Sequence, residues 1–198
     1  SGDTRQAGAD YNVAIGISSL GLDTKGNKSV AIGAETLTTQ NFASSTDSFN
    51  TAVGYAAGKA VTTGIYNTFL GGDAGKSLTD ADFNVAVGTY ALDKDELGSK
   101  STALGYNVAV GYAALSSDDL GSQSVAIGTS ALENQNSATA VTTYNTAVGY
   151  GAGIAVTTGT SNTFVGHRAG DGTDDGAENV AVGNSALSAN CGNGNTAM

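Results

Sequence analysis

Residues Asn12–Gly16 have the sequence NVAIG, and close variants of this five-residue motif recur along the rest of the chain. Each copy begins with Asn or Ser, continues with Val or Thr and then Ala or Phe, and ends with an aliphatic residue and Gly. The later copies are SVAIG at Ser29, NTAVG at Asn50, NTFLG at Asn67, NVAVG at Asn84, NVAVG at Asn107, SVAIG at Ser124, NTAVG at Asn145, NTFVG at Asn162 and NVAVG at Asn179.

The spacing of the copies is nearly constant. The closing glycines are residues 16, 33, 54, 71, 88, 111, 128, 149, 166 and 183, so their separations are 17, 21, 17, 17, 23, 17, 21, 17 and 17 residues. A fixed period in this range is typical of stacked supersecondary units. The separations themselves repeat after 95 residues, which divides one continuous solenoid into a block at 12–106 and a block at 107–198, after a short start at 1–11.

The residue types favour β-structure over helix, because Gly occurs in every repeat and Val, Ile and Thr fill the apolar positions. Each coil is expected to contain a strand on the motif, a turn at its Gly, and a return segment carrying Ala-Leu or Ala-Gly, as in Ala131-Leu132 and Ala57-Gly58. The sequence therefore predicts an all-β fold, a parallel β-roll of about ten coils of 17–23 residues. Equivalent positions then stack, which predicts an asparagine ladder interrupted at Ser29 and Ser124.

Side chains alternate across a strand, so Val13 and Ile15 face one side while Asn12, Ala14 and Gly16 face the other. Because Val and Ile are large and apolar, we expect their side to pack on the leucines as the core of the coil. The small side is then left for a close contact between chains, as at a symmetry axis, which predicts self-association; a monomer with this side in water is the alternative. The predicted contact residues are Ala14, Ala31, Ala52, Ala86, Ala109, Ala126, Ala147 and Ala181.

The longer separations locate three polar insertions, at Thr38–Ser48, Asp93–Tyr106 and Glu133–Thr143. The second insertion contains a degenerate motif, STALG at residues 101–105. Asn195–Met198 resembles the beginning of another motif, so the chain is expected to be a fragment of a longer fibre.

Composition limits the partners. The net charge of −10 disfavours nucleic acid and anionic membrane surfaces, because no basic stripe is present to neutralise phosphates. No apolar stretch approaches the ~20 residues of a membrane span, so no membrane insertion is expected. The single Cys191 forms no internal disulfide.

The sequence nominates no catalytic, cofactor-binding or metal-binding residues, and the prediction is that the protein is not an enzyme and uses no cofactor. His167 is the only histidine and is expected at the surface. Tyr55, Tyr112 and Tyr150 each follow a motif Gly, where packing at the coil corner is favoured over a contact row for sugar or protein. The acidic clusters are expected to be solvated turns rather than calcium sites; they are Asp93, Asp95 and Glu96, then Asp118 and Asp119, then Asp171, Asp174 and Asp175.

The SVAIG and NVAVG copies resemble the head repeats of trimeric autotransporter adhesins of the YadA type, in which three parallel β-rolls pack around a common axis. The copies at Asn50–Gly58, Asn145–Gly153 and Asn162–Gly170 resemble repeats of bacteriophage tail fibres and related virion proteins. The resemblance implies a structural, non-catalytic shaft or head segment of a trimeric tail fibre or similar virion appendage that supports host attachment.

The partners that this resemblance implies are other fibre segments or virion proteins and a cell-surface glycan or protein receptor, and the location is the virion, or the cell surface. A bacterial surface adhesin head that binds host or matrix molecules is the main alternative. A polysaccharide-degrading tailspike and an ice-binding solenoid are minor ones.

Overall fold

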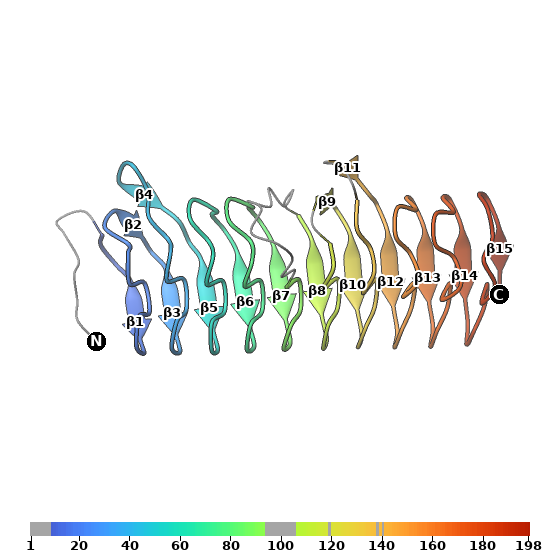
Figure 1. The fold of residues 1–198 in the computed structure, drawn as a ribbon, viewed down its shortest axis with the longest axis horizontal. Coiled ribbons are helices and arrows are strands. Elements are labelled where there is room, and N and C mark those ends of the chain that lie inside the picture. The colour runs from blue at the N-terminus through green and yellow to red at the C-terminus, as the bar shows by residue number, and fades with distance from the viewer. Residues whose placement is uncertain (1–8, 94–105, 119, 138, 140) are drawn as a thin grey trace.

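The computed structural model describes residues 9–93, 106–118, 120–137, 139 and 141–198. In this part of the chain the fold is all-β, without a helix, and eleven short strands form one parallel sheet that runs the length of the molecule (Figure 1). The strands are β1 (Val13–Ile15), β3 (Val30–Ile32), β5 (Thr51–Val53), β6 (Thr68–Leu70), β7 (Val85–Val87), β8 (Val108–Val110), β10 (Val125–Ile127), β12 (Thr146–Val148), β13 (Thr163–Val165), β14 (Val180–Val182) and β15 (Thr196–Ala197).

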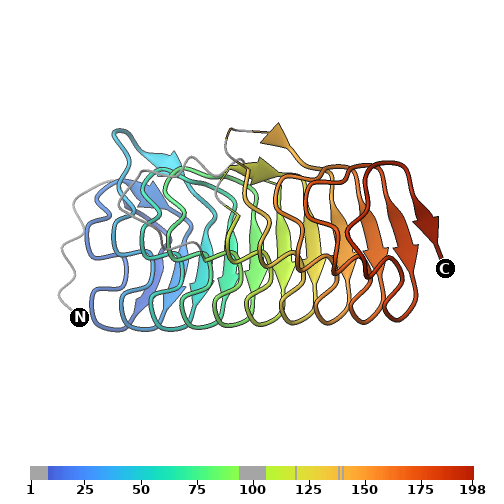
Figure 2. The same cartoon turned by 45° about the vertical axis from the view of Figure 1, so that its right-hand side comes forward.

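Each of the ten motifs forms one strand, so the predicted parallel solenoid is confirmed. The motif positions pair in register from coil to coil, for example Ala14 with Ala31 and Val125 with Thr146. Figure 2 shows the chain winding as successive loops of similar outline between the two termini. We number these loops as coils 1 to 10, in the order of their motifs.

The insertions of coils 2 and 7 are not wholly irregular. Each contains a two-residue strand that pairs with the coil before it: β4 (Thr46–Asp47) with β2 (Gly26–Asn27), and β11 (Val141–Thr142) with β9 (Gly121–Ser122). Both pairs lie beside the main row of strands in Figure 1. The degenerate motif at residues 101–105 lies outside the described residues.

The assignment of the two sides of the strand was wrong. Ala31, Ala52, Ala86, Ala109, Ala126, Ala147 and Ala181 are fully buried inside the coils, and Ala14 packs against the same cluster. The alternate residues point outward, and Ile127 of the same strand as Ala126 keeps 39% of its surface exposed. The alanines therefore line the interior of each chain and are not available for a contact between chains.

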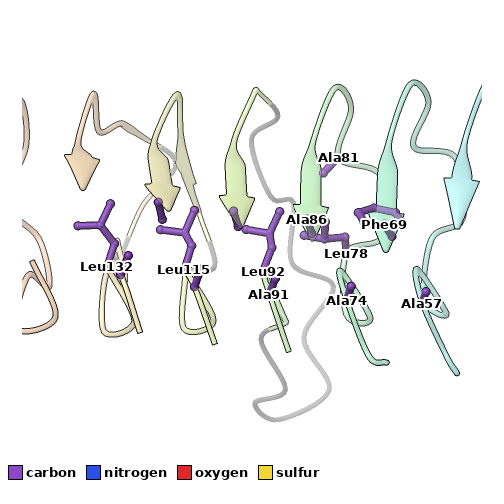
Figure 3. Packing of buried hydrophobic residues seen from close by; sticks show 14 of the residues in the cluster. Ala57, Phe69, Ala74, Leu78, Ala81, Ala86, Ala91, Leu92, Leu115 and Leu132 are labelled. Atoms are coloured by element: carbon purple, nitrogen blue, oxygen red, sulfur yellow. The ribbon is translucent and has the colours of Figure 1, made fainter. Parts of the chain in front are cut away.

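The reason is the narrow interior of the coil. Leu37, Leu92, Leu115 and Leu132 of the return segments are buried, as predicted. Figure 3 shows Leu92, Leu115 and Leu132 at equivalent places in successive coils. A leucine from one wall fills the space up to the strand, so the strand contributes only a methyl group. A second large side chain at the same level would overfill a close-packed core.

Coils 4 and 9 reverse this arrangement. Phe69 and Phe164 replace the inward alanine and are fully buried, while the leucine position of the return segment is Gly. A Cβ added at Gly58 would lie 2.7 Å from Cδ2 of Phe69, and a Cβ at Gly75 would collide with the same ring from the other side. One phenylalanine thus occupies the volume of the leucines missing from two coils.

The closing glycines are required by backbone geometry. Gly54 has a φ of +136°, and a Cβ there would collide with the carbonyl of Gly71 in the next coil. The same close approach recurs between Gly33 and Gly54. The Gly column therefore fixes both the turn after each strand and the spacing of the coils.

The predicted asparagine ladder is confirmed. Oδ1 of Asn67 accepts from the backbone N–H of Asn84 at 2.9 Å, and Nδ2 of Asn67 donates to the carbonyl of Ala81, in the last turn of its own coil, at 2.8 Å. The same pair of contacts recurs at Asn50, Asn107, Asn145 and Asn162. These buried amides therefore join their coil to the next and close their own coil, and they satisfy backbone groups that face the interior. Nδ2 of Asn179 is the exception, since it is buried without a hydrogen-bond partner among the described residues.

Where the ladder is interrupted by Ser, a glutamine takes over. Nε2 of Gln135 donates to Asp118 at 2.9 Å and to Ser124 at 3.1 Å, and its Oε1 accepts from Nδ2 of Asn145 at 2.7 Å. Asp118 also accepts from the N–H of Gly121. The same network recurs 95 residues earlier, with Gln40 joining Asp23, Ser29 and Asn50.

We expect Phe69→Ala to lower the free energy of unfolding by about 3–5 kcal/mol, because the ring is fully buried. Adding Gly75→Leu should restore part of this loss. The backbone at Gly75 (φ 58°) matches that of Leu92 and Leu115 (φ 51° and 53°), so a leucine fits there once the ring is gone. Denaturant unfolding of the single and double variants measures the coupling. A double variant less stable than Phe69→Ala alone would contradict this account of the interior.

We also expect Asn67→Ala to destabilise the chain by roughly 1–3 kcal/mol for each buried backbone group that it leaves without a partner. The groups concerned are the N–H of Asn84 and the carbonyl of Ala81. The exposed Asn136→Ala is the matched control for thermal and denaturant unfolding. Similar losses for the two variants would show that the ladder amides contribute nothing specific.

Candidate functional site: the outward sheet face

The outward side chains of the strands form one continuous uncharged surface, aliphatic except for four threonines, which we call the sheet face. It consists of the first and third residues of each strand, and its exposed members include Ile15 (58% exposed) and Val182 (41%). The first column holds Val13, Val30, Thr51, Thr68, Val85, Val108, Val125, Thr146, Thr163 and Val180, and the second holds Ile15, Ile32, Val53, Leu70, Val87, Val110, Ile127, Val148, Val165 and Val182. No charged residue occurs in either column.

A column of left-handed residues flanks the start of the strands; we call it the start column. It consists of the residue before each motif, and every member has a φ between 50° and 71°. Its members are Tyr11, Lys28, Phe49, Tyr66, Phe83, Tyr106, Gln123, Tyr144, Ser161 and Glu178. Such angles are strained for bulky residues, so the stacking of the coils must hold them. The N–H of Tyr66, for example, donates to the carbonyl of Ser48 in the coil before.

Within the start column, Phe49, Tyr66, Phe83 and Tyr106 stack on one another. The ring centroids are 5.3, 4.9 and 5.2 Å apart, and the ring planes are within 11° of parallel. Nζ of Lys28 lies 5.0 Å from the centroid of Phe49. The rings nevertheless remain 42–61% exposed. We call these four residues the ring stack.

The opposite edge of the sheet face is the end column, the residue after each motif Gly. Its members are Ile17, Ala34, Tyr55, Gly72, Thr89, Tyr112, Thr129, Tyr150, His167 and Asn184. The tyrosines expected to pack at the corner are in fact more than half exposed, at 55–58%. His167 is at the surface as predicted; it stacks on Tyr150 at 5.3 Å, and its Nδ1 lies 2.9 Å from Oδ1 of Asn184.

Ion pairs lie on the turns beside this edge. Lys59 donates to Glu35 at 2.7 Å; this hydrogen bond and the ammonium charge lower the pKa of Glu35 and raise that of Lys59. Both side chains are more than a third exposed, so the pair is screened and stabilises the fold only modestly.

The acidic clusters separate into different environments. Asp118 is buried and belongs to the glutamine network, which corrects the expectation of a solvated turn. Asp171 accepts from Nε of Arg168 at 2.7 Å, and the N–H of Asp175 donates to Asp174 and lowers the pKa of that carboxyl. Asp95, Glu96 and Asp119 lie outside the described residues.

In the part of the chain that the structure describes, no group of three or more His, Cys, Asp and Glu side chains gathers in a way that would hold a metal ion. Cys191 is a partly buried free thiol, with Sγ 3.1 Å from Oγ1 of Thr173. The described ranges also contain no helix with the length and apolar character that a membrane crossing requires.

Comparison with protein-family models, with curated proteins and with solved structures gave no match to this chain.

Because Leu132 faces the interior and Ile127 faces outward, truncating these two residues should change the stability of a single chain by different amounts. Leu132→Ala should lower the unfolding free energy of the chain by about 2–5 kcal/mol, because it opens a cavity in the core. Ile127→Ala should cost clearly less within the chain, since the side chain is 39% exposed. Denaturant unfolding at low protein concentration, where association is weakest, provides the comparison. Equal losses would place Ile127 in the core after all.

Proposed function

We propose that this chain is a non-catalytic shaft or head segment of a homotrimeric fibre, such as a phage tail fibre or a similar virion appendage, which supports attachment to a host. The observation that carries the proposal is the sheet face, an uncharged column pair of Val, Ile, Leu and Thr on every coil. Contiguous apolar patches of a few hundred Å² on a protein surface are often functional contact surfaces. The sheet face is therefore suited to burial against other chains.

Assembly around an axis parallel to the rod suits this surface. A sheet of in-register strands presents side chains of the same kind at every level, so identical chains related by such an axis make a similar contact along their whole length. The resemblance of the SVAIG and NVAVG copies to trimeric adhesins favours three chains. The contact residues are then valines and isoleucines, and the alanines remain inside each chain.

A mechanical role follows from the axial bonding. The strands, the asparagine ladder and the backbone of the turns all connect each coil to its neighbours along the rod. A solenoid of this kind extends by the addition of coils without a change in its cross-section. Such a rod is suited to holding a receptor-binding part at a distance, at the virion or cell surface.

A bacterial surface adhesin head is the second candidate. The exposed aromatic side chains of the start and end columns favour it, because tyrosines with one free edge are common in protein contacts. Direct binding of the wild-type segment to host or matrix molecules would favour this candidate over a spacer.

We expect the wild-type segment to sediment as a trimer and Val110→Lys to dissociate it. Val110 is on the sheet face near the middle of the rod, and three lysines would be buried together without partners. The circular dichroism of the variant should retain the β signal, because the substituted side chain points out of the coil. The control is Asn136→Lys, an exposed insertion residue, which should remain trimeric.

Two results would contradict the proposal. A wild-type segment that is monomeric at high concentration would exclude the trimer. Release of new reducing ends from host-surface polysaccharide by the purified segment would exclude the non-catalytic role.

A further inference from the structure

The ring stack has an unusual exposure. Each inner ring is covered on both faces by its neighbours about 5 Å away, and Lys28 lies over the outer face of Phe49. Tyr106 ends the stack, with Phe83 against one face only, while Phe49, Tyr66 and Phe83 expose mainly their ring edges. Stacking of a sugar needs an open ring face, so the three covered rings are poorly suited to a glycan. Ring edges instead suit side-on contact with other aromatic rings and small side chains.

Symmetry determines what meets these edges. This inference rests on the proposed assembly about an axis along the rod. Rotation about that axis keeps coil level with coil and brings the start edge of one sheet face against the end edge of the next, as in any heterologous cyclic contact. The ring stack of coils 3 to 6 then faces the end column of the same coils in the neighbouring chain. An antiparallel pair would instead bring start edge against start edge.

The end column has the right chemistry at those levels. Its residues in coils 3 to 6 are Tyr55, Gly72, Thr89 and Tyr112, two exposed rings with two small residues between them. No Asp, Glu, Lys or Arg occurs anywhere in the end column. Lys28 and Glu178 are the charged members of the start column. At their coil levels the end column of the neighbouring chain presents Ala34 and Asn184, so neither residue meets a like charge.

An interface of sufficient area also requires that the start and end columns take part in the contact. Ten coils at ~4.8 Å and three strand residues at ~3.3 Å give the sheet face alone a flat area of roughly 480 Å². In a trimer that area is shared between two neighbours, so one interface totals roughly 480 Å², well below the ~1,000 Å² expected of a specific interface. Extending the contact to the seven residues from start to end column raises the total to roughly 1,100 Å².

We infer that the ring stack of each chain packs against the end column of the neighbouring chain, coil level with coil, and that this seam sets the register of the assembly. The second block lacks the stack, because the positions equivalent to Tyr66 and Phe83 are Ser161 and Glu178. The aromatic contacts of the seam are therefore concentrated in the first block, whereas the sheet face remains uncharged along the whole rod.

The second block supplies test substitutions that the fold already accepts. Ser161 and Glu178 have φ values of 59° and 61°, against 58° and 59° at Tyr66 and Phe83. We expect the double variant Tyr66→Ser/Phe83→Glu to keep its β circular dichroism and to require an about tenfold or higher concentration for trimer formation, since aromatic contacts are lost in three seams. The control is Ser161→Tyr, which adds a ring outside the stack and should leave the trimer intact.

Disulfide cross-linking tests the register directly, in a Cys191→Ser background. Chains carrying Tyr66→Cys are mixed with chains carrying Gly72→Cys, a site where an added Cβ meets no atom within 4 Å. Within one chain the two positions are six residues apart along a strand, roughly 20 Å, too far for a disulfide. We expect links between the two chain types and none when Thr129→Cys, three coils further on, replaces Gly72→Cys.

The outcomes separate the seam from the trimer itself. A trimer that forms no 66–72 link and is not weakened by the double variant would overturn the seam and leave the proposed fibre standing. Links between Tyr66→Cys chains and Gln123→Cys chains, whose coils 4 and 7 lie level in a fully overlapped antiparallel pair, would overturn it in favour of antiparallel pairing. A monomeric wild-type segment would overturn both proposals.

Discussion

The narrow interior of the coil is the constraint on which the rest of the structure depends. One wall contributes a leucine and the strand contributes a methyl group, or the strand contributes a phenylalanine and the wall contributes only backbone. In coils 3 and 8 neither large side chain is present, because the phenylalanine of the next coil fills the space beside Gly58 and Gly153. Close packing allows no third arrangement with two large side chains at one level. Because the inward positions are occupied in this way, the β-branched residues of every strand face outward. The apolar sheet face is therefore a consequence of the small core.

The polar interior depends on the same narrowness. A chain that turns back every 17–23 residues directs many backbone groups inward, where water is excluded. Asparagine reaches both the next coil and the end of its own coil, and the two glutamine networks perform this task where Ser breaks the ladder. Each coil alone satisfies neither its polar groups nor its apolar ones. Stability is consequently a property of the stack, as in other solenoids.

Much of the fold was predictable from the sequence, and the error had a specific cause. Spacing located the strands and the coils, and identical residues at identical spacing predicted the asparagine ladder and the buried leucines. The size of the side chains alone was the wrong criterion for deciding which side of the strand faces inward. The sequence shows that Phe replaces the strand Ala at Phe69 where Gly replaces the return-segment Leu at Gly58 and Gly75. A large residue that appears where others become small indicates that these positions fill the same space, so the Ala/Phe side of the strand faces the interior. The ring stack was visible too, since its members precede successive motifs, but the insertions concealed their common level. The tertiary partners of Gln40 and Gln135 have no comparable sequence signal, because these residues lie in the insertions.

The most direct measurement of the central claim is the alkylation rate of a cysteine placed at Ala126 or at Ile127, in a Cys191→Ser background. Each is measured in the assembled protein and in the dissociated Val110→Lys chain. The account predicts that the thiol at 126 is protected in both states, because it lies inside the coil. The thiol at 127 is predicted to be protected only in the assembly, because the neighbouring chain covers it there. A thiol at 126 that reacts in the dissociated chain as fast as the thiol at 127, or a thiol at 127 that reacts equally in both states, would contradict the account.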